Sequence, residues 1–236
     1  PEHYGWLPDG ADTGDYHGES REDLVLRGIG YASGFQETDY SYGQAVRTAT
    51  FWLLLAGFGV HNVIASGFNL HVYPFLTDIG MGEAASGMMI LMIVFTLPGR
   101  FFGGVIADRV PKLKLQLLLV VAFALQVVGI TVYLLSGTTA AVYLLLACHG
   151  LSTGAVTPVV LLMLGRYFGR KAFGSITGTL VACLAPIGMV APVFYGWIHD
   201  MTDSYRVAFI TSLCLACAAS LITAFIRPPR GTDSGI

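Results

Sequence analysis

Arg100 is the residue of this sequence best placed to do chemistry, because it is the one base well inside a long apolar run. It precedes Asp108 by eight residues. In a helix that rises about 1.5 Å per residue, it therefore lies about 12 Å from that polar end. That depth is near the middle of a bilayer core about 30 Å thick. A guanidinium there costs about 2.5–3.5 kcal/mol to insert, so it usually faces a cavity and marks a pathway.

The guanidinium group predicts an anionic ligand. Its planar fork keeps its charge and pairs bidentately with carboxylates. The alternative is a structural role for Arg100, paired with an acid or with backbone carbonyl groups. No acidic residue falls at a comparable depth in any of the apolar runs, so a partner would have to come from substrate or from outside this chain. Both interpretations stay open, and we favour substrate binding.

Polar side chains recur at helical spacing in two other apolar runs. Steps of four, three and four residues place the first stripe on one face of a helix: Asn62, Ser66, Asn69 and Tyr73. The second stripe comprises His149, Thr153 and Thr157. Polar helix segments line midplane sites in membrane transport proteins, so both stripes are candidate substrate contacts. Hydrogen bonding between helices, without any ligand, is the alternative.

Other motifs carry little chemistry. His61 and His149 are candidates for moving protons, and a buried, neutral, hydrogen-bonded histidine is the alternative. The pair Cys214-Xaa2-Cys217 lies on one apolar helix that we expect to be buried, and it lacks a second pair of metal ligands. The sequence contains no phosphate-binding loop, nucleophile elbow or His-Glu-Xaa2-His motif. We therefore expect no cofactor, no metal and no enzyme activity.

The composition excludes a water-soluble domain. Of the 236 residues, 54% are hydrophobic and 12% are charged, and the mean hydropathy is +0.66. An average soluble domain carries about 25% charged residues. The net charge of −2 offers no basic surface for nucleic acid. The remaining class is an all-α integral membrane protein whose surroundings are the lipid bilayer.

Six apolar runs are each long enough for a helix that crosses a bilayer, which takes about 20 residues. Strands are disfavoured because the runs do not alternate and lipid tolerates no open sheet edge. The expected spans are Thr48–Tyr73, Ala84–Ile106, Leu113–Leu135, Ala140–Leu164, Ser175–Ile198 and Val207–Ile226.

Local signals predict how some of these helices begin and pack. Ser41 and Gln44 fit a capping box, which predicts a helix that continues as the first span. Asp203 or Ser204 is a candidate cap of the sixth span. Two glycine pairs at a spacing of four predict close helix packing: Gly99 with Gly103, and Gly150 with Gly154.

Basic residues lie in alternate loops, and this predicts the orientation. Bases precede the first span, separate the second from the third and the fourth from the fifth, and follow the sixth, whereas the opposite loops hold only Arg206. The positive-inside rule then predicts a multi-pass protein of the cytoplasmic (inner or plasma) membrane. Residues 1–46 form an acidic, largely irregular cytoplasmic loop in this prediction, 47–227 the six-helix bundle, and 228–236 a cytoplasmic tail. The chain opens on Pro1 without a basic leader, and we expect a fragment that starts in a loop.

Several motifs together resemble the major facilitator superfamily. The segment Gly104-Val-Ile-Ala-Asp108-Arg109-Val-Pro-Lys112 is similar to its cytoplasmic signature, with Pro111 in place of the usual glycine. Residues 1–10, 165–174 and 196–206 resemble further family segments, which occur in the same order in the family. The resemblance implies the C-terminal six-helix half of a twelve-helix fold, partnered by an N-terminal half that this sequence lacks. It also implies that Gly104, Asp108, Arg109 and Lys112 form a gating motif, with Asp108 as a latch at a helix N-terminus. A solvated loop charge is the alternative for Asp108.

The sequence Pro98-Gly99-Arg100 is similar to the monocarboxylate porter and oxalate/formate antiporter group. That resemblance implies that Arg100 holds a substrate carboxylate. The fifth span has no Lys or Arg, which favours a monocarboxylate over a doubly charged substrate. We therefore predict a secondary transporter of small organic anions that works by alternating access. The alternatives are a drug or neutral-solute exporter of the same superfamily and a non-transporting membrane receptor or scaffold.

Overall fold

A computed structural model describes residues 39–229, and the secondary structure of that part is helical. Expectations for residues 1–38 and 230–236, which include most of the predicted loop and tail, lie outside the described residues. Two short elements are α2 (Tyr42–Ala45) and the 3-10 helix η2 (Lys112–Lys114). The long helices are α3 (Ala49–Asp78), α4 (Gly82–Arg109), α5 (Gln116–Ser136), α6 (Thr139–Phe168), α7 (Phe173–Thr202) and α8 (Arg206–Ala224).

The prediction of six membrane spans is confirmed, because all six long helices are long and apolar enough to cross a membrane. Most run a few residues beyond the predicted bounds. The first continues past Tyr73 to Asp78 and includes Pro74. Proline is tolerated inside a membrane helix where neighbouring groups satisfy the freed backbone carbonyl.

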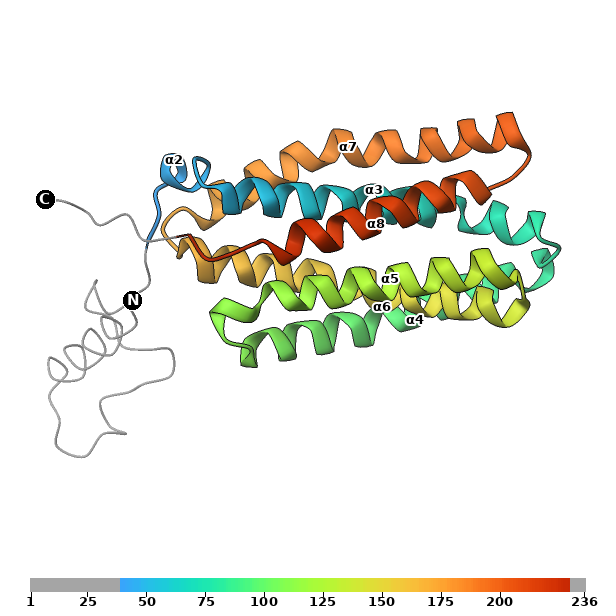
Figure 1. Ribbon diagram of the computed structural model, residues 1–236, viewed down its shortest axis with the longest axis horizontal. Helices are drawn as coiled ribbons and strands as arrows, with labels where there is room; N and C mark the ends of the chain where they lie inside the picture. Colours follow the sequence, from blue (N-terminus) through green and yellow to red (C-terminus); the bar gives the residue numbers. More distant parts are fainter. Residues whose placement is uncertain (1–38, 230–236) are drawn as a thin grey trace, which may run out of the picture. The chain divides into compact units, whose positions relative to one another are not determined.

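The helices pack in a repeating pattern (Figure 1). Helix α6 packs most extensively on α4 and α5, α3 packs on α7 and α8, and α5 packs on α8. Exchanging α3, α4 and α5 with α6, α7 and α8 leaves this pattern unchanged. Such three-plus-three repeats within a six-helix unit are typical of transporters of the major facilitator type.

The buried side chains form two clusters, one near each end of the bundle. One includes Phe51, Leu115 and Tyr167 and lies toward the loops that carry the basic residues, segments 110–115 and 169–172. We call this the basic end. The other includes Phe75 and Phe209 and lies toward segments 79–81, 137–138 and 203–205, which we call the opposite end.

Helices α4 and α6 approach each other closely at glycines, as the sequence predicts. A side-chain carbon added at Gly99 would lie 2.5 Å from the Leu151 carbonyl oxygen, and one at Gly154 would overlap the Thr96 carbonyl oxygen. The same added carbon at Gly154 would lie 2.9 Å from the backbone nitrogen of Arg100. Every one of these neighbours is backbone, so a larger residue would force the helices apart.

The packed part of the chain begins before residue 47. Tyr40 is buried at 2% exposure, its N–H donates to the Phe168 carbonyl at 2.9 Å, and its ring meets Phe168 edge-on. The Asp39 carboxylate accepts the backbone N–H of Arg170 at 3.0 Å. Residues 39–46 are thereby held against the loop between α6 and α7.

The predicted capping box is confirmed, but the helix that it starts does not continue as the first span. The Ser41 hydroxyl accepts the Gln44 N–H, and the Gln44 side chain accepts the Ser41 N–H at 2.9 Å. Helix α2 ends after four residues, and Thr48 caps α3 separately through the N–H of Phe51. The Trp52 indole donates to the Val46 carbonyl at 2.9 Å and stabilises this break.

The N-cap residue of α8 is Tyr205, which forms no side-chain cap hydrogen bond, so neither of the two candidates for the sixth span is the cap; a side-chain contact with the start of the helix comes from Ser204. Its hydroxyl accepts the backbone N–H of Arg206 at 3.1 Å. Asp203 instead ends α7, in a left-handed conformation with φ of 48°. Aspartate is among the non-glycine residues that best tolerate this region.

We predict that Gly154→Ala destabilises the protein by about 1–3 kcal/mol, since the added methyl group overpacks a contact made of backbone. Alanine is the better helix former by about 1 kcal/mol, but that gain is smaller than the cost of the overlap. The matched control is Gly87→Ala in α4, where nothing lies within 4 Å of the added carbon. Thermal unfolding of the purified protein should show a loss for the first variant and none for the second. Equal unfolding temperatures would contradict the close-packing assignment.

Candidate functional site

Arg100 lies on the exposed face of α4, nine residues before Arg109, the last residue of the helix. Its backbone is held against α6 at Gly154. Among residues 39–229, its guanidinium forms no hydrogen bond and no ion pair. The structural-pairing interpretation therefore finds no partner in the described part of this chain.

Three of the candidate site residues meet between α3 and α6. The His149 ring nitrogen Nε2 lies 3.1 Å from the Asn69 amide oxygen and 3.4 Å from the Thr153 hydroxyl. The amide oxygen accepts, so Nε2 carries the proton in this arrangement, a tautomer assigned from the hydrogen bonding. His149 is 1% exposed, and its other nitrogen, Nδ1, is buried without a hydrogen-bond partner in the part of the chain that the structure describes.

The remaining stripe residues are not drawn into that cluster. The Ser66 hydroxyl donates to the Asn62 carbonyl of its own helix at 2.7 Å. The Asn62 amide oxygen occupies the space that a side chain at Gly188 of α7 would need. Tyr73 is 49% exposed, near the opposite end of the bundle. The stripe therefore shares a helix face, but within residues 39–229 only Asn69 forms a hydrogen bond with the second stripe, and the Thr157 side chain forms none.

The two histidines of α3, His61 and His71, contact other groups and do not reach the cluster. The His61 ring stacks on Phe58 at 5.8 Å between centroids and meets Phe123 edge-on. His71 Nε2 lies 2.9 Å from the Pro192 carbonyl oxygen, and its Nδ1 lies 3.0 Å from the Tyr205 hydroxyl. Burial raises the pKa of Tyr205, and the carboxylates of Asp78 and Asp200 raise it further, so the hydroxyl keeps its proton and donates to Nδ1.

The residues of the predicted gating motif lie at the basic end, where α4 stops. The Asp108 side chain is 70% exposed, Arg109 is exposed, and Gly104 has open space around its α-carbon. Lys112 is partly exposed in η2. Its backbone carbonyl accepts a hydrogen bond from the Tyr167 hydroxyl at 3.1 Å. Within the described residues, the Asp108 carboxylate pairs with Arg166 at 3.9 Å and forms no contact with a helix N-terminus.

Arg166 is a residue whose role sequence reasoning missed. From α6 it donates to three carbonyl groups at the end of α4: Ala107 at 3.2 Å, Asp108 at 2.8 Å and Val110 at 2.9 Å. The last carbonyl groups of a helix have no partners within the helix, and a guanidinium offers enough donors for several of them. The sequence identified Arg166 only as part of a basic loop. Every residue has a backbone carbonyl, so the residue types at 107, 108 and 110 give no sign of this contact.

Cys214 and Cys217 lie together on α8, one of the six apolar spans, as the sequence predicts. Both are exposed on α8, as Cys183 is on α7, while Cys148 is buried. Their face of α8 is turned away from the helix packing. No group of metal-ligating side chains occurs among the residues that the structure describes.

The sequence family agrees with this architecture. The family model of the Major Facilitator Superfamily matches residues 15–185. The chain belongs to this superfamily. Its six spans and their repeated packing are those of a six-helix half of a major facilitator fold.

The chain is also similar to a curated protein, the probable sulfoacetate transporter SauU of Cupriavidus necator. The two are 29% identical over 224 residues, an alignment that covers 86% of this chain and 51% of the relative. The chain thus spans about half the length of that relative. Superfamily membership and this relative agree with the expectation of a transporter rather than an enzyme.

We predict that Arg166→Gln lowers the free energy of unfolding by about 1.5–3 kcal/mol, the range for losing hydrogen bonds from a charged donor. Glutamine has too few donors to replace all three contacts with the end of α4. Lys114→Gln is the control, because Lys114 is an exposed base of the same end; surface changes of this kind stay within about 0.5 kcal/mol. Thermal unfolding of both purified variants measures the difference, and equal stability would contradict the assigned role of Arg166.

Proposed function

We propose that this chain forms half of a secondary transporter that carries small organic anions, with Arg100 as the anion anchor. One observation carries the proposal: Arg100 is exposed, and its guanidinium is unpaired within the described part of the chain. The helical rise from the end of α4 predicts that it lies near the middle of the bilayer. A permanent charge at that depth is costly to insert unless it faces a polar space or a partner. An anionic substrate supplies both the opposite charge and two acceptor oxygens.

The surroundings of α4 support an anion more than a cation. The acidic residues of the described part lie near helix ends, for example Glu83 and Asp108 at either end of α4. The polar cluster of Asn69, His149 and Thr153 lies on the helices that flank the site, and it is formally neutral. A mid-membrane cavity bounded by these helices would therefore carry positive charge from Arg100 alone.

The substrate class in this proposal is a small organic acid, and in particular a monocarboxylate. A single guanidinium binds one carboxylate bidentately, and α7 supplies no second base inside its span. The relative is named for the transport of sulfoacetate, which carries a carboxylate and a sulfonate and is therefore a dianion; it supports the class of small organic acids but not the restriction to monocarboxylates. A carboxylate offers two acceptor oxygens and a sulfonate offers three, and a guanidinium can donate to two oxygens of either group.

Alternating access would follow from rocking of this bundle against an N-terminal six-helix half. In this mechanism the basic end faces the cytoplasm, as the positive-inside rule predicts. Asp108, exposed at that end, serves as a latch that closes one state and opens during turnover. Arg166 holds the end of α4 that presents Asp108.

We predict that Arg100→Gln lowers anion transport about tenfold or more, because a charge-assisted hydrogen bond is worth about 1.5–3 kcal/mol. The assay is counterflow of labelled formate, lactate, pyruvate, oxalate or sulfoacetate, one at a time, into liposomes that hold the full-length protein. Lys171→Gln serves as the control, since it removes an exposed loop base instead. Full counterflow in Arg100→Gln would refute the anchor. No counterflow of any acid by folded wild-type protein would favour a neutral-solute or drug exporter, or a scaffold.

We predict that Asp108→Asn slows turnover several-fold while the apparent KM changes little. Asp108 lies about 12 Å along the helix from Arg100, too far to contact the same substrate. Initial rates of counterflow over a range of anion concentrations separate the two parameters. A loss of affinity at unchanged maximal rate would contradict the latch.

A further inference from the structure

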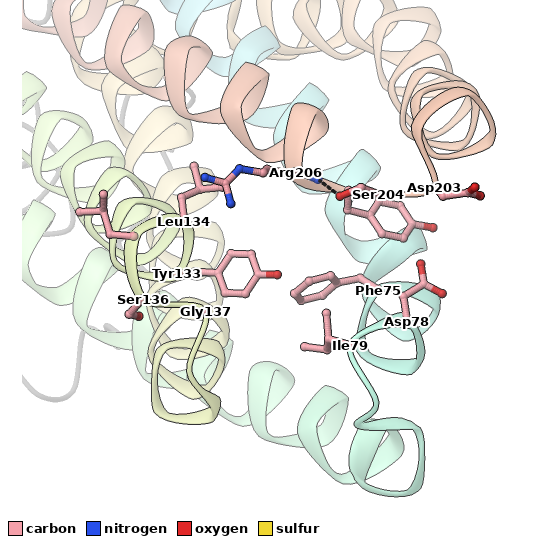
Figure 2. A pocket seen from close by; sticks show the side chains of 12 residues that line it. Phe75, Asp78, Ile79, Tyr133, Leu134, Ser136, Gly137, Asp203, Ser204 and Arg206 are labelled. Carbon is pink, nitrogen blue, oxygen red and sulfur yellow. Dashed lines mark hydrogen bonds between the residues drawn. The ribbon is translucent and has the colours of Figure 1, made fainter.

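A pocket of about 400 Å³ opens at the opposite end of the bundle, where α3 and α5 end and α8 begins (Figure 2). That volume is within the range of small-molecule sites. Its wall mixes charged, hydroxyl and apolar groups. Those on which the argument depends are Arg206, Asp203, Asp78, Ser204, Tyr133 and Leu135.

This pocket lies on the far side of α3 from the polar stripe of the proposed substrate path. Phe75 lines it and meets Tyr133 of α5 and Phe209 of α8 edge-on, at 5.2 and 4.9 Å between ring centroids. At about 100° per residue, Phe75 is rotated by roughly 180–240° from the four stripe residues. A ligand in this pocket would therefore lie on a different face of α3 from the four stripe residues.

The charges in the pocket are separated. Figure 2 shows the Arg206 side chain on the α5 side and Asp78 and Asp203 on the opposite side, near the end of α7. The backbone N–H of Arg206 donates to the Ser204 hydroxyl. The Arg206 guanidinium has no hydrogen-bond or ion-pair partner among residues 39–229. Asp78 is paired with His199 at 2.6 Å, whereas the Asp203 carboxylate has no such partner within the same range.

We propose that this pocket binds the headgroup of a zwitterionic phospholipid that carries a primary amine. The phosphate lies at Arg206, where the positive end of the α8 dipole adds to the attraction. The ammonium group lies toward Asp203 and Asp78, whose carboxylates accept its hydrogen bonds. The chemistry recognised is thus one phosphate and one primary ammonium group on opposite walls.

The position of the pocket favours a lipid over a soluble phosphate ester. It lies at the ends of three spans, the level at which headgroups meet water and at which tyrosines such as Tyr133 and Tyr205 concentrate. Its rim is apolar: Leu135 is 83% exposed and Ile79 is 39% exposed. Acyl chains attached to the headgroup would cover these side chains, and a soluble ester would leave them in water.

The test uses the full-length protein, purified in detergent and stripped of lipid. Native mass spectrometry follows its titration with phosphatidylethanolamine, phosphatidylcholine and phosphatidylglycerol of identical acyl chains. Glycerophosphoethanolamine and inorganic phosphate form two further arms without acyl chains. We expect phosphatidylethanolamine to bind about tenfold more tightly than the other lipids, because losing one charge-assisted hydrogen bond lowers affinity by about that factor. The two soluble compounds should bind more weakly still.

Three variants locate the site. Arg206→Gln should lose about tenfold in phosphatidylethanolamine affinity, and Arg206→Lys should keep most of it, because the phosphate contact needs a cation. Asp203→Asn should lose the preference for phosphatidylethanolamine over phosphatidylcholine. The control is Arg47→Gln, an exposed arginine beside a span at the basic end, which should bind like the wild type.

The outcomes separate this proposal from its rivals. Equal binding of the three lipids, or unchanged binding by Arg206→Gln, would overturn it. Binding of glycerophosphoethanolamine or phosphate as tightly as the lipid would overturn the membrane source. The assay involves no transport, so its result is independent of whether Arg100 carries an anion.

Discussion

The close approach of α4 to α6 is the contact on which the rest of the candidate site depends. Between helices in lipid, apolar burial contributes little, and association comes from van der Waals packing that small residues allow. Gly99, Gly103, Gly150 and Gly154 bring the two backbones together, and α4 and α6 form the most extensive contact of the bundle. Because Gly154 lies against the Arg100 backbone, this contact fixes where that backbone lies relative to α6.

The two ends of the bundle are held by different chemistry. At the basic end, charged and backbone groups meet: Arg166 binds the last carbonyl groups of α4, and Asp39 binds the loop after α6. At the opposite end, aromatic and imidazole groups join α3, α7 and α8 through His71, Tyr205 and the pair of His199 with Asp78. At the basic end, α6 thereby holds the end of α4 that carries Asp108, and at the opposite end these contacts lie beside the pocket at Arg206.

Much of the fold could be predicted because lipid permits few alternatives. A run of about 20 apolar residues must satisfy its own backbone, so it is a helix, and six such runs were located nearly to their ends. The glycine spacing likewise predicted close packing, since a missing side chain is visible in the sequence. The break between α2 and α3 could not be predicted, because it depends on the contact of Trp52 with the Val46 carbonyl.

The sequence by itself determined the membrane class, the number of spans, the lone mid-membrane base and the two polar stripes, since each follows from residue type and helical period. Only the tertiary structure decided which polar residues meet: Asn69 joins His149 and Thr153, Asn62 turns to α7, and Ser66 bonds to its own helix. It also assigned Arg166 to the end of α4 and placed Arg206 in a pocket with separated charges. The reason is that helical period fixes a residue's direction from its own axis, whereas its partners depend on how neighbouring helices are rotated and spaced.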